Sequence, residues 1–213
     1  MVTPFEDVWA LLERTVFPVR STPTAFNQYR DVHDELDLPD APARRRQNLR
    51  NYFSVYEGVP DVFILAEAPG PWGCRFSGIP ITSEAQLLDP TFPISGRRSS
   101  SCSRPHEEYS AKIYWRVLLP DFGRFFTWNS VPYHPHKPEV PLSIRTPGLL
   151  EIAAQRETLR SMLDTLRPAE VVAVGKRAEY ALGRLGQACT YVRHPSQGGS
   201  KLFERGMREV FGH

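Results

Sequence analysis

Three short segments, far apart in the sequence, carry the side chains best suited to chemistry. The first runs from Leu65 to Glu84 and holds a carboxylate near each end, Glu67 and Glu84, around a loop rich in glycine and proline. Such a loop lets the backbone approach a ligand closely. It is neither a Walker loop, since no Gly-Lys-Ser/Thr follows, nor a G-x-G-x-x-G motif. By itself it indicates a generic ligand loop with a carboxylate beside it.

The second segment, Phe126 to His136, contains an asparagine at the expected end of a buried strand. The amide of Asn129 can donate and accept hydrogen bonds at once, which suits reading the edge of a base. The alternative is that Asn129 only satisfies backbone groups of its loop. His134 and His136 have no evident Asp, Glu or Cys partner nearby, so no metal site is expected there.

The third segment, Val192 to Ser200, places His194 before a Pro-Ser turn and two glycines. This arrangement can hold one ring nitrogen in a pocket, although a lone histidine is more commonly structural. Ser196, Ser200 and free backbone N–H groups are suited to holding phosphate oxygens.

The elements around these segments predict how they are positioned. Short apolar runs predict strands over Asp61–Ala66, Phe125–Val131, Glu170–Val174 and Thr190–Arg193. Strands that alternate with helices are typical of an α/β fold, here a three-layer αβα arrangement with a central four-stranded, mainly parallel sheet. Ligands of such sheets lie beyond the carboxyl ends of the strands, where three of the four strands enter the segments above.

Helical spacing and capping residues predict the helices. Three N-terminal helices are expected over residues 5–15, 24–36 and 43–56, and four more over 110–118, 147–166, 176–185 and 201–211. Residues 90–105 form the least structured part. One domain is expected over 1–213, with an N-terminal helical cap over 1–58 and an α/β core over 59–213.

Composition limits the remaining possibilities. The net charge is only +2, and no run of 18 apolar residues exists, which excludes a transmembrane helix. The N-terminus lacks the pattern of a signal peptide, so a cytoplasmic location is expected. Three cysteines with long spacings favour neither a disulfide framework nor a zinc knuckle.

Together the three segments resemble the uracil-DNA glycosylase superfamily. The first resembles the G-E-A-P-G motif of its iron–sulfur branch and aligns without gaps to the A-P-x-x-x-G-x-x-x-(S/T)-G motif of a second branch. The second resembles the motif whose strand-end Asn reads uracil. The third resembles the His-Pro-Ser motif that grips the excised base and adjacent phosphates. Their order and spacing match, and the resemblance covers Asp61 to Phe211.

The resemblance implies a monofunctional DNA glycosylase of base excision repair, which hydrolyses the N-glycosidic bond of uracil or a related deaminated base. Asn129 would bind the polar edge of the flipped base, and His194 would donate to the O2 side of the leaving uracil. Glu84 is the first choice for the catalytic carboxylate, because it aligns with an Asp base, and Glu67 is the second. The other residues expected to bind the base are Ala68, Pro69, Gly70, Trp72, Phe76 and Ile81. Those expected to bind DNA are Arg193, Ser196, Gln197, Gly198, Ser200 and Lys201, with Arg97, Arg98 and Arg104 as further phosphate contacts.

The chain also departs from the family pattern. Ala66 replaces a motif glycine, and Ile81 stands where many members have a base-stacking Phe, so stacking is expected from Phe76 or Trp72. The iron–sulfur branch needs four cysteines, so no cluster, metal or other cofactor is expected. The expected partner is DNA containing uracil or a related damaged base, bound by a monomer that is cytoplasmic and nucleoid-associated, with no membrane.

Two alternatives stay open. One is a nucleic-acid-binding protein of the same fold whose active site has decayed. The departures from the family pattern at Ala66 and Ile81 motivate this alternative. The other is a nucleotide-binding α/β enzyme that acts on free nucleotides.

Overall fold

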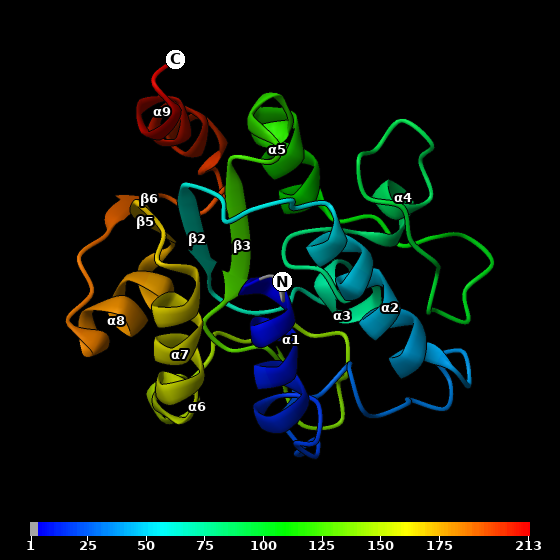
Figure 1. The fold of residues 1–213 in the computed structure, drawn as a ribbon. Coiled ribbons are helices and arrows are strands. Elements are labelled where there is room, and N and C mark those ends of the chain that lie inside the picture. The colour runs from blue at the N-terminus through cyan, green and yellow to red at the C-terminus, as the bar shows by residue number, and fades with distance from the viewer. Residues whose placement is uncertain (1–3) are drawn as a thin grey trace.

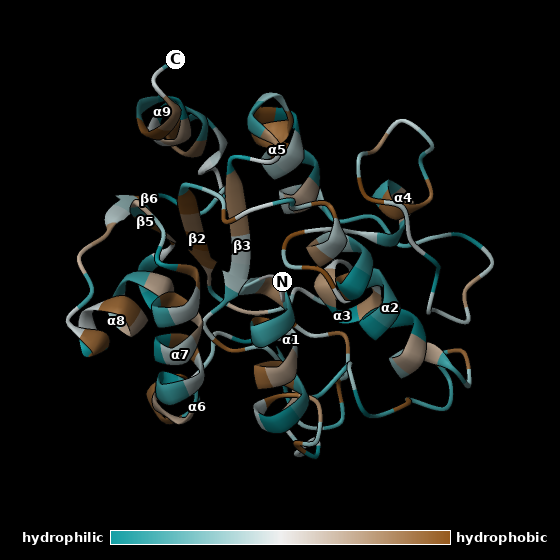
Figure 2. Cartoon of the chain, in the orientation of Figure 1, coloured by the Kyte–Doolittle hydropathy of each residue, from teal (hydrophilic) through white to brown (hydrophobic). Residues whose placement is uncertain are grey.

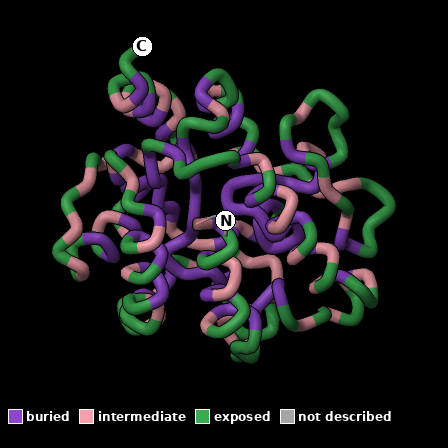
Figure 3. Tube along the Cα trace, in the orientation of Figure 1, coloured by how far each residue is buried: buried purple, intermediate pink, exposed green. Residues whose placement is uncertain are grey.

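A four-stranded sheet forms the centre of the computed structural model, which describes residues 4–213 (Figure 1). Its strands are β2 (Val62–Ala66), β3 (Phe125–Asn129), β5 (Glu170–Val174) and β6 (Thr190–Val192). They lie in the order β3-β2-β5-β6, and every neighbouring pair is parallel. The predicted sheet is therefore confirmed. β2 and β3 are buried along their whole length, as Figure 3 shows, which explains why they are apolar on both faces.

Alternating side chains of β3 show which helices cover which face. The ring of Phe125 lies 6.2 Å from that of Tyr114 in α5 (Tyr109–Leu118), and it also contacts α9 (Ser200–Phe211). The ring of Phe126 lies 5.1 Å from that of Phe5 in α1 (Pro4–Thr15) and 5.4 Å from that of Tyr52 in α2 (Ala41–Ser54). Because successive strand residues point to opposite faces, helices cover both sides of the sheet and make three layers.

The other helices complete these layers and the loops around them. α7 (Arg156–Leu166) packs on α1, and α8 (Lys176–Leu185) packs on β5 and α7. Figure 2 shows apolar residues along β2 and on the inner sides of these helices. The short helices are α3 (Cys74–Ser77), α4 (Glu84–Leu87), α6 (Leu149–Ala154) and the 3-10 turn η1 (Leu119–Asp121). No helix in the described part of the chain is both long and apolar enough to span a membrane.

Two predicted helices differ from the structure. Residues 24–36 form turns and the strand β1 (Ala25–Phe26), which pairs with β4 (His134–Pro135). The side chain of Asn27 donates to the carbonyls of Val16 and Val19 and accepts from the N–H of Tyr29. Such side-chain bonds compete with helical ones, so the prediction of a helix was wrong. The predicted helix over 147–166 is divided at Gln155 into α6 and α7. The division of the chain at residue 58 stays a prediction.

A buried ion cluster joins the N-terminal region to the loop that follows β2. The carboxylate of Asp37 accepts hydrogen bonds from Arg45 in α2 and from Arg75 in α3, and all three side chains are buried. Burial opposes ionisation of Asp37, but the two guanidinium groups hold its pKa below the usual value. Arg45 also donates to Ser99 Oγ at 2.9 Å. The cluster thus fixes α3 and the irregular segment around Ser99 against α2.

Removing the anion of this cluster should be costly. We expect Asp37→Ala to lower the free energy of unfolding by about 3–5 kcal/mol, because it leaves two buried guanidinium groups without a counter-charge. Urea unfolding followed by circular dichroism measures the change. The control is Asp40→Ala, which removes a surface carboxylate that pairs with Arg44 and should leave the midpoint almost unchanged. Equal midpoints for the two variants would contradict a stabilising role for the cluster.

Candidate active site

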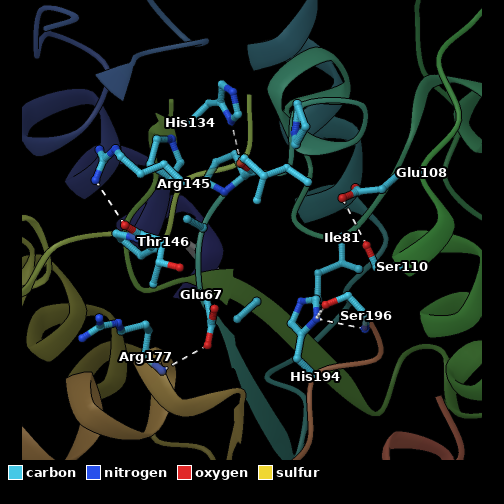
Figure 4. Close-up of a pocket in the computed structure, with 18 of the residues that line it drawn as sticks. Glu67, Ile81, Glu108, Ser110, His134, Arg145, Thr146, Arg177, His194 and Ser196 are labelled. Atoms are coloured by element: carbon cyan, nitrogen blue, oxygen red, sulfur yellow. Dashed lines mark hydrogen bonds between the residues drawn. The ribbon is translucent and has the colours of Figure 1, made fainter. Parts of the chain in front are cut away.

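A pocket of about 370 Å³ lies at the carboxyl ends of the parallel strands (Figure 4). The register sets Ala66 at the end of β2 opposite Asn129 at the end of β3. The pairing continues past the strands, since the N–H groups of Ser130 and Val131 donate to the carbonyls of Ala66 and Glu67. Four loops line the pocket, with residues 66–71, 134–135, 144–147, 193–194 and 196–197, together with Ile81, Glu108, Ser110, Lys176 and Arg177.

His194 lines this pocket just after β6 in a defined protonation state. Its Nδ1 accepts the backbone N–H of Ser196 at 3.2 Å and lies 2.8 Å from Ser196 Oγ. Since a backbone N–H can only donate, the ring proton resides on Nε2. Burial, and after it the positive charge of Arg193, lowers the pKa of His194 to about 4. At neutral pH the ring is therefore an uncharged donor through Nε2–H, and that nitrogen has no hydrogen-bond partner within residues 4–213.

Glu67 leaves β2 directly into the same pocket. Its Oε1 accepts the backbone N–H of Arg177 at 3.1 Å, at the start of α8, where the helix dipole favours negative charge. A Cβ at Gly175 would lie 2.4 Å from this oxygen, so a glycine is required for the contact. Ser130 Oγ donates to the Glu67 carbonyl at 2.6 Å. The carboxylate is thus held by a backbone N–H at the edge of the pocket.

Glu84 is not brought to the pocket, which corrects its choice as the first catalytic carboxylate. It is fully buried, and its oxygens accept hydrogen bonds from the N–H groups of Ser99, Ser100 and His106 and from Ser100 Oγ. These four contacts satisfy the carboxylate and leave no access for a substrate. Its role here is to fix the irregular segment between α4 and α5.

Asn129 is buried behind the wall of the pocket rather than on its surface. Its Nδ2 lies 3.6 Å from Cys74 Sγ, and its Oδ1 has no hydrogen-bond partner among residues 4–213. The Nε2 of Gln28 also reaches this thiol, at 3.9 Å. An unpaired buried oxygen costs free energy, so the amide keeps hydrogen-bonding capacity that the fold does not use.

The residues expected to hold the base divide into two groups. Ala68, Pro69, Gly70 and Ile81 line the pocket, but Trp72 and Phe76 do not. The ring of Phe76 is fully buried, with the ring of His106 at 4.1 Å and the guanidinium of Arg75 at 4.3 Å. Trp72 packs beside His106 on the outer side. The expectation that Phe76 or Trp72 stacks on the base is therefore wrong for this arrangement.

Ile81 lines the pocket in a strained backbone conformation. Its φ is +44°, which is rare for a β-branched residue. Strain of this kind is retained where the surrounding structure enforces it, and it gathers at functional sites.

Only part of the expected DNA-binding set reaches the pocket. Arg193, Ser196 and Gln197 line the pocket. Gly198, which precedes α9, and Ser200 and Lys201, which begin it, lie beyond the pocket. The pocket lining does not include Arg97, Arg98 or Arg104 either. Three further cations, Arg145, Lys176 and Arg177, line it without having been predicted. The last two begin α8, with one residue between them and the end of β5, so the strand-end rule applied to β5 would have found them.

His134, Glu108 and Ser110 were also missed as pocket residues. Both ring nitrogens of His134 contact carbonyls, of Pro69 at 2.8 Å and Pro141 at 3.0 Å, so the ring joins two loops. Within the described residues, no three His, Cys, Asp or Glu side chains gather as metal ligands do.

Comparisons with known proteins agree with this arrangement. The family model described as the uracil DNA glycosylase superfamily matches residues 53–205. The crystal structure of wild-type Pedobacter heparinus SMUG2 superposes with a TM-score of 0.63 at 14% identity, over 100% of this chain and 98% of that one. A search of curated proteins found no match. The superposition shows the fold, and the family match covers both the strand-end loops and the pocket. The chain belongs to the uracil DNA glycosylase superfamily.

Proposed function

We propose that the protein is a monofunctional DNA glycosylase that hydrolyses the N-glycosidic bond of uracil or a related deaminated base during base excision repair. The observation that carries the proposal is a pairing of opposite groups in one pocket. A neutral His194 offers a free Nε2–H, and the Glu67 carboxylate is held beside it by the start of α8 (Figure 4).

These two groups match the charges that develop in the reaction. As the glycosidic bond breaks, the sugar becomes positive and the base becomes negative. Glu67 would orient a water molecule and stabilise the cationic sugar. His194 would donate a hydrogen bond from its Nε2–H to the leaving base. Donors and charges fixed in advance toward such positions are usually the largest catalytic contribution.

Asn129 is proposed to read the base. In the described part of the chain its side-chain carbonyl oxygen has no hydrogen-bond partner and its amide nitrogen has only a weak sulfur contact, so a base edge offers better hydrogen bonds to both. A polar group that the wrong base leaves unpaired discriminates strongly between substrates. The base must first leave the helical stack, which costs least when it is mismatched.

Cations around the pocket support DNA as the partner. Arg177 and Arg193 line it and form no ion pair within the described residues. Arg145 and Lys176 are partly neutralised by Glu151 and Glu179. We propose that the two unpaired arginines contact phosphates next to the flipped nucleotide, and that a monomer acts on cytoplasmic, nucleoid DNA.

Loss of Asn129 or His194 should damage excision most. We expect Asn129→Ala and His194→Ala each to slow single-turnover excision from a uracil-containing duplex by about 100- to 1000-fold, because His194 is proposed to donate to the leaving base and Asn129, from behind the pocket wall, is proposed to bind its edge. Asn51→Ala and His213→Ala are controls, since both side chains lie outside the pocket. Wild-type rates for both Asn129→Ala and His194→Ala would refute the assignment, and binding without excision by the wild type would favour the decayed alternative.

The two glutamates should separate in their effects. Glu67→Gln should slow excision by about 100-fold at little cost to stability, because its charge acts on the reaction. Glu84→Gln should lower the free energy of unfolding by about 1–3 kcal/mol, because the buried carboxylate accepts four hydrogen bonds. Single-turnover rates and urea midpoints measure both. The reverse pattern would restore Glu84 as the catalytic carboxylate.

The protonation state of His194 can be measured directly. The pKa lies below the ordinary value for histidine, so the ring stays neutral as the pH falls from 7 and gains its second proton near pH 4. Nitrogen NMR of labelled protein should show the Nε2–H tautomer at pH 7, with His194→Ala identifying the signal. A midpoint near 6.5, or an Nδ1–H tautomer, would contradict the proposed donor.

A further inference from the structure

A second carboxyl group faces the pocket from the segment before α5. Glu108 lies across the pocket from Glu67 in Figure 4, and its carboxyl rests against the loop after β2. A Cβ at Gly70 would lie 2.1 Å from Glu108 Oε1, and a Cβ at Gly73 would lie 1.7 Å from Oε2. Neither glycine has a positive φ. The absence of side chains at these two positions therefore makes room for the carboxyl.

Glu108 has few structural contacts of its own. Within residues 4–213 its carboxyl accepts one hydrogen bond, from Ser110 Oγ at 3.1 Å, and has no ion-pair partner. Its neighbour Glu107 is exposed and pairs with Lys112, and Glu84 is satisfied by four donors. Burial raises the pKa of Glu108 to about 7, and the bond from Ser110 offsets this only in part. A large fraction of the carboxyl is neutral near neutral pH.

The position of Glu108 relative to the other groups suggests what it contacts. Glu67 and His194 take the side of the pocket where the glycosidic bond would break. Asn129 lies behind the loop that carries Gly73, since its amide reaches the thiol of the next residue, Cys74. Glu108 lies on the pocket side of that loop. A base bound between these groups presents to Glu108 an edge away from the sugar.

We propose that Glu108 is a specificity-determining residue whose carboxyl hydrogen-bonds to the lactam edge of the flipped base. The proposal rests on the glycosylase function proposed above. Deamination creates a lactam, an N–H beside a C=O, in uracil, hypoxanthine and xanthine. A neutral carboxyl offers the complementary pair, an O–H donor beside a C=O acceptor. An ionised carboxylate keeps only acceptors and faces the lactam carbonyl with a negative charge.

The pH dependence follows from the groups around Glu108. The titratable groups that face it are Cys74, directly after the loop that carries Gly70 and Gly73, and Glu67, His134 and His194 on the pocket walls. The cations around the pocket are Arg145, Lys176, Arg177 and Arg193. Burial raises the pKa of Cys74 and lowers the pKa of both histidines to about 4. None of these three titrates near pH 7, so a loss of excision as the pH rises through about 7 would be attributed to ionisation of Glu108.

The test compares Glu108→Ala and Glu108→Gln with the wild type, using Glu107→Gln as a matched surface control. Single-turnover excision is measured between pH 5.5 and 8.5 on duplexes containing uracil, hypoxanthine, xanthine or thymine. We expect Glu108→Ala to slow excision of the preferred base by about tenfold or more and to change the ratios between bases. Glu108→Gln, whose amide also pairs with a lactam, should keep the rate at pH 7 within about threefold and remove the decline at higher pH.

Several results would overturn the proposal. Unchanged ratios and pH profiles in both variants would show that Glu108 does not read the base. Faster excision of every base by Glu108→Ala would show that the carboxyl only obstructs the pocket. Equal losses in both variants with the decline intact would show a structural role. A wild type that excises none of the four bases would refute the glycosylase function itself, and the base-reading role with it.

Discussion

The parallel pairing of β2 with β3 is the constraint on which the site depends. It brings Ala66 level with Asn129, and two backbone bonds beyond the strands extend the pairing into the loop that carries Glu67. The pairing of β2 with β5 then leads to Gly175 and the start of α8, whose backbone holds the Glu67 carboxylate. The positions of these groups are thus set by main-chain hydrogen bonds rather than by flexible side chains.

The wall of the pocket that carries Glu108 is not supported by a strand of the described sheet. Buried charged side chains hold this wall in position instead. Asp37 and its two arginine partners fix α3 behind the loop that carries Gly70 and Gly73. Glu84 accepts four hydrogen bonds from the segment that leads to Glu108. Each of these carboxylates is fully paired, whereas Glu67 and Glu108, which line the pocket, each have a carboxyl oxygen with no hydrogen-bond donor among residues 4–213. The same residue type therefore serves structure or chemistry according to how many donors surround it.

The sequence allowed the sheet and much of the site to be predicted, because apolar runs and polar strand ends are local signals. Ala68, Gly70, His194 and Ser196 all lie where the strand-end rule expects them. The sequence could not decide between Glu67 and Glu84 as the catalytic carboxylate, because a motif match carries no information on burial or on hydrogen-bond donors from distant segments. Glu108 belongs to no motif, and its position depends on tertiary contacts alone. The helix expected over 24–36 failed because Asn27 bonds to distant carbonyls.

We propose above that this pocket breaks an N-glycosidic bond in DNA. The most direct measurement is a strand-nicking assay, in which purified wild-type protein is incubated with oligonucleotide duplexes of identical sequence with and without one uracil, and abasic sites are then cleaved with alkali. We expect a single cut at the uracil position, release of the free base and an intact normal duplex. Both duplexes remaining uncut, even where the protein binds them, would contradict it.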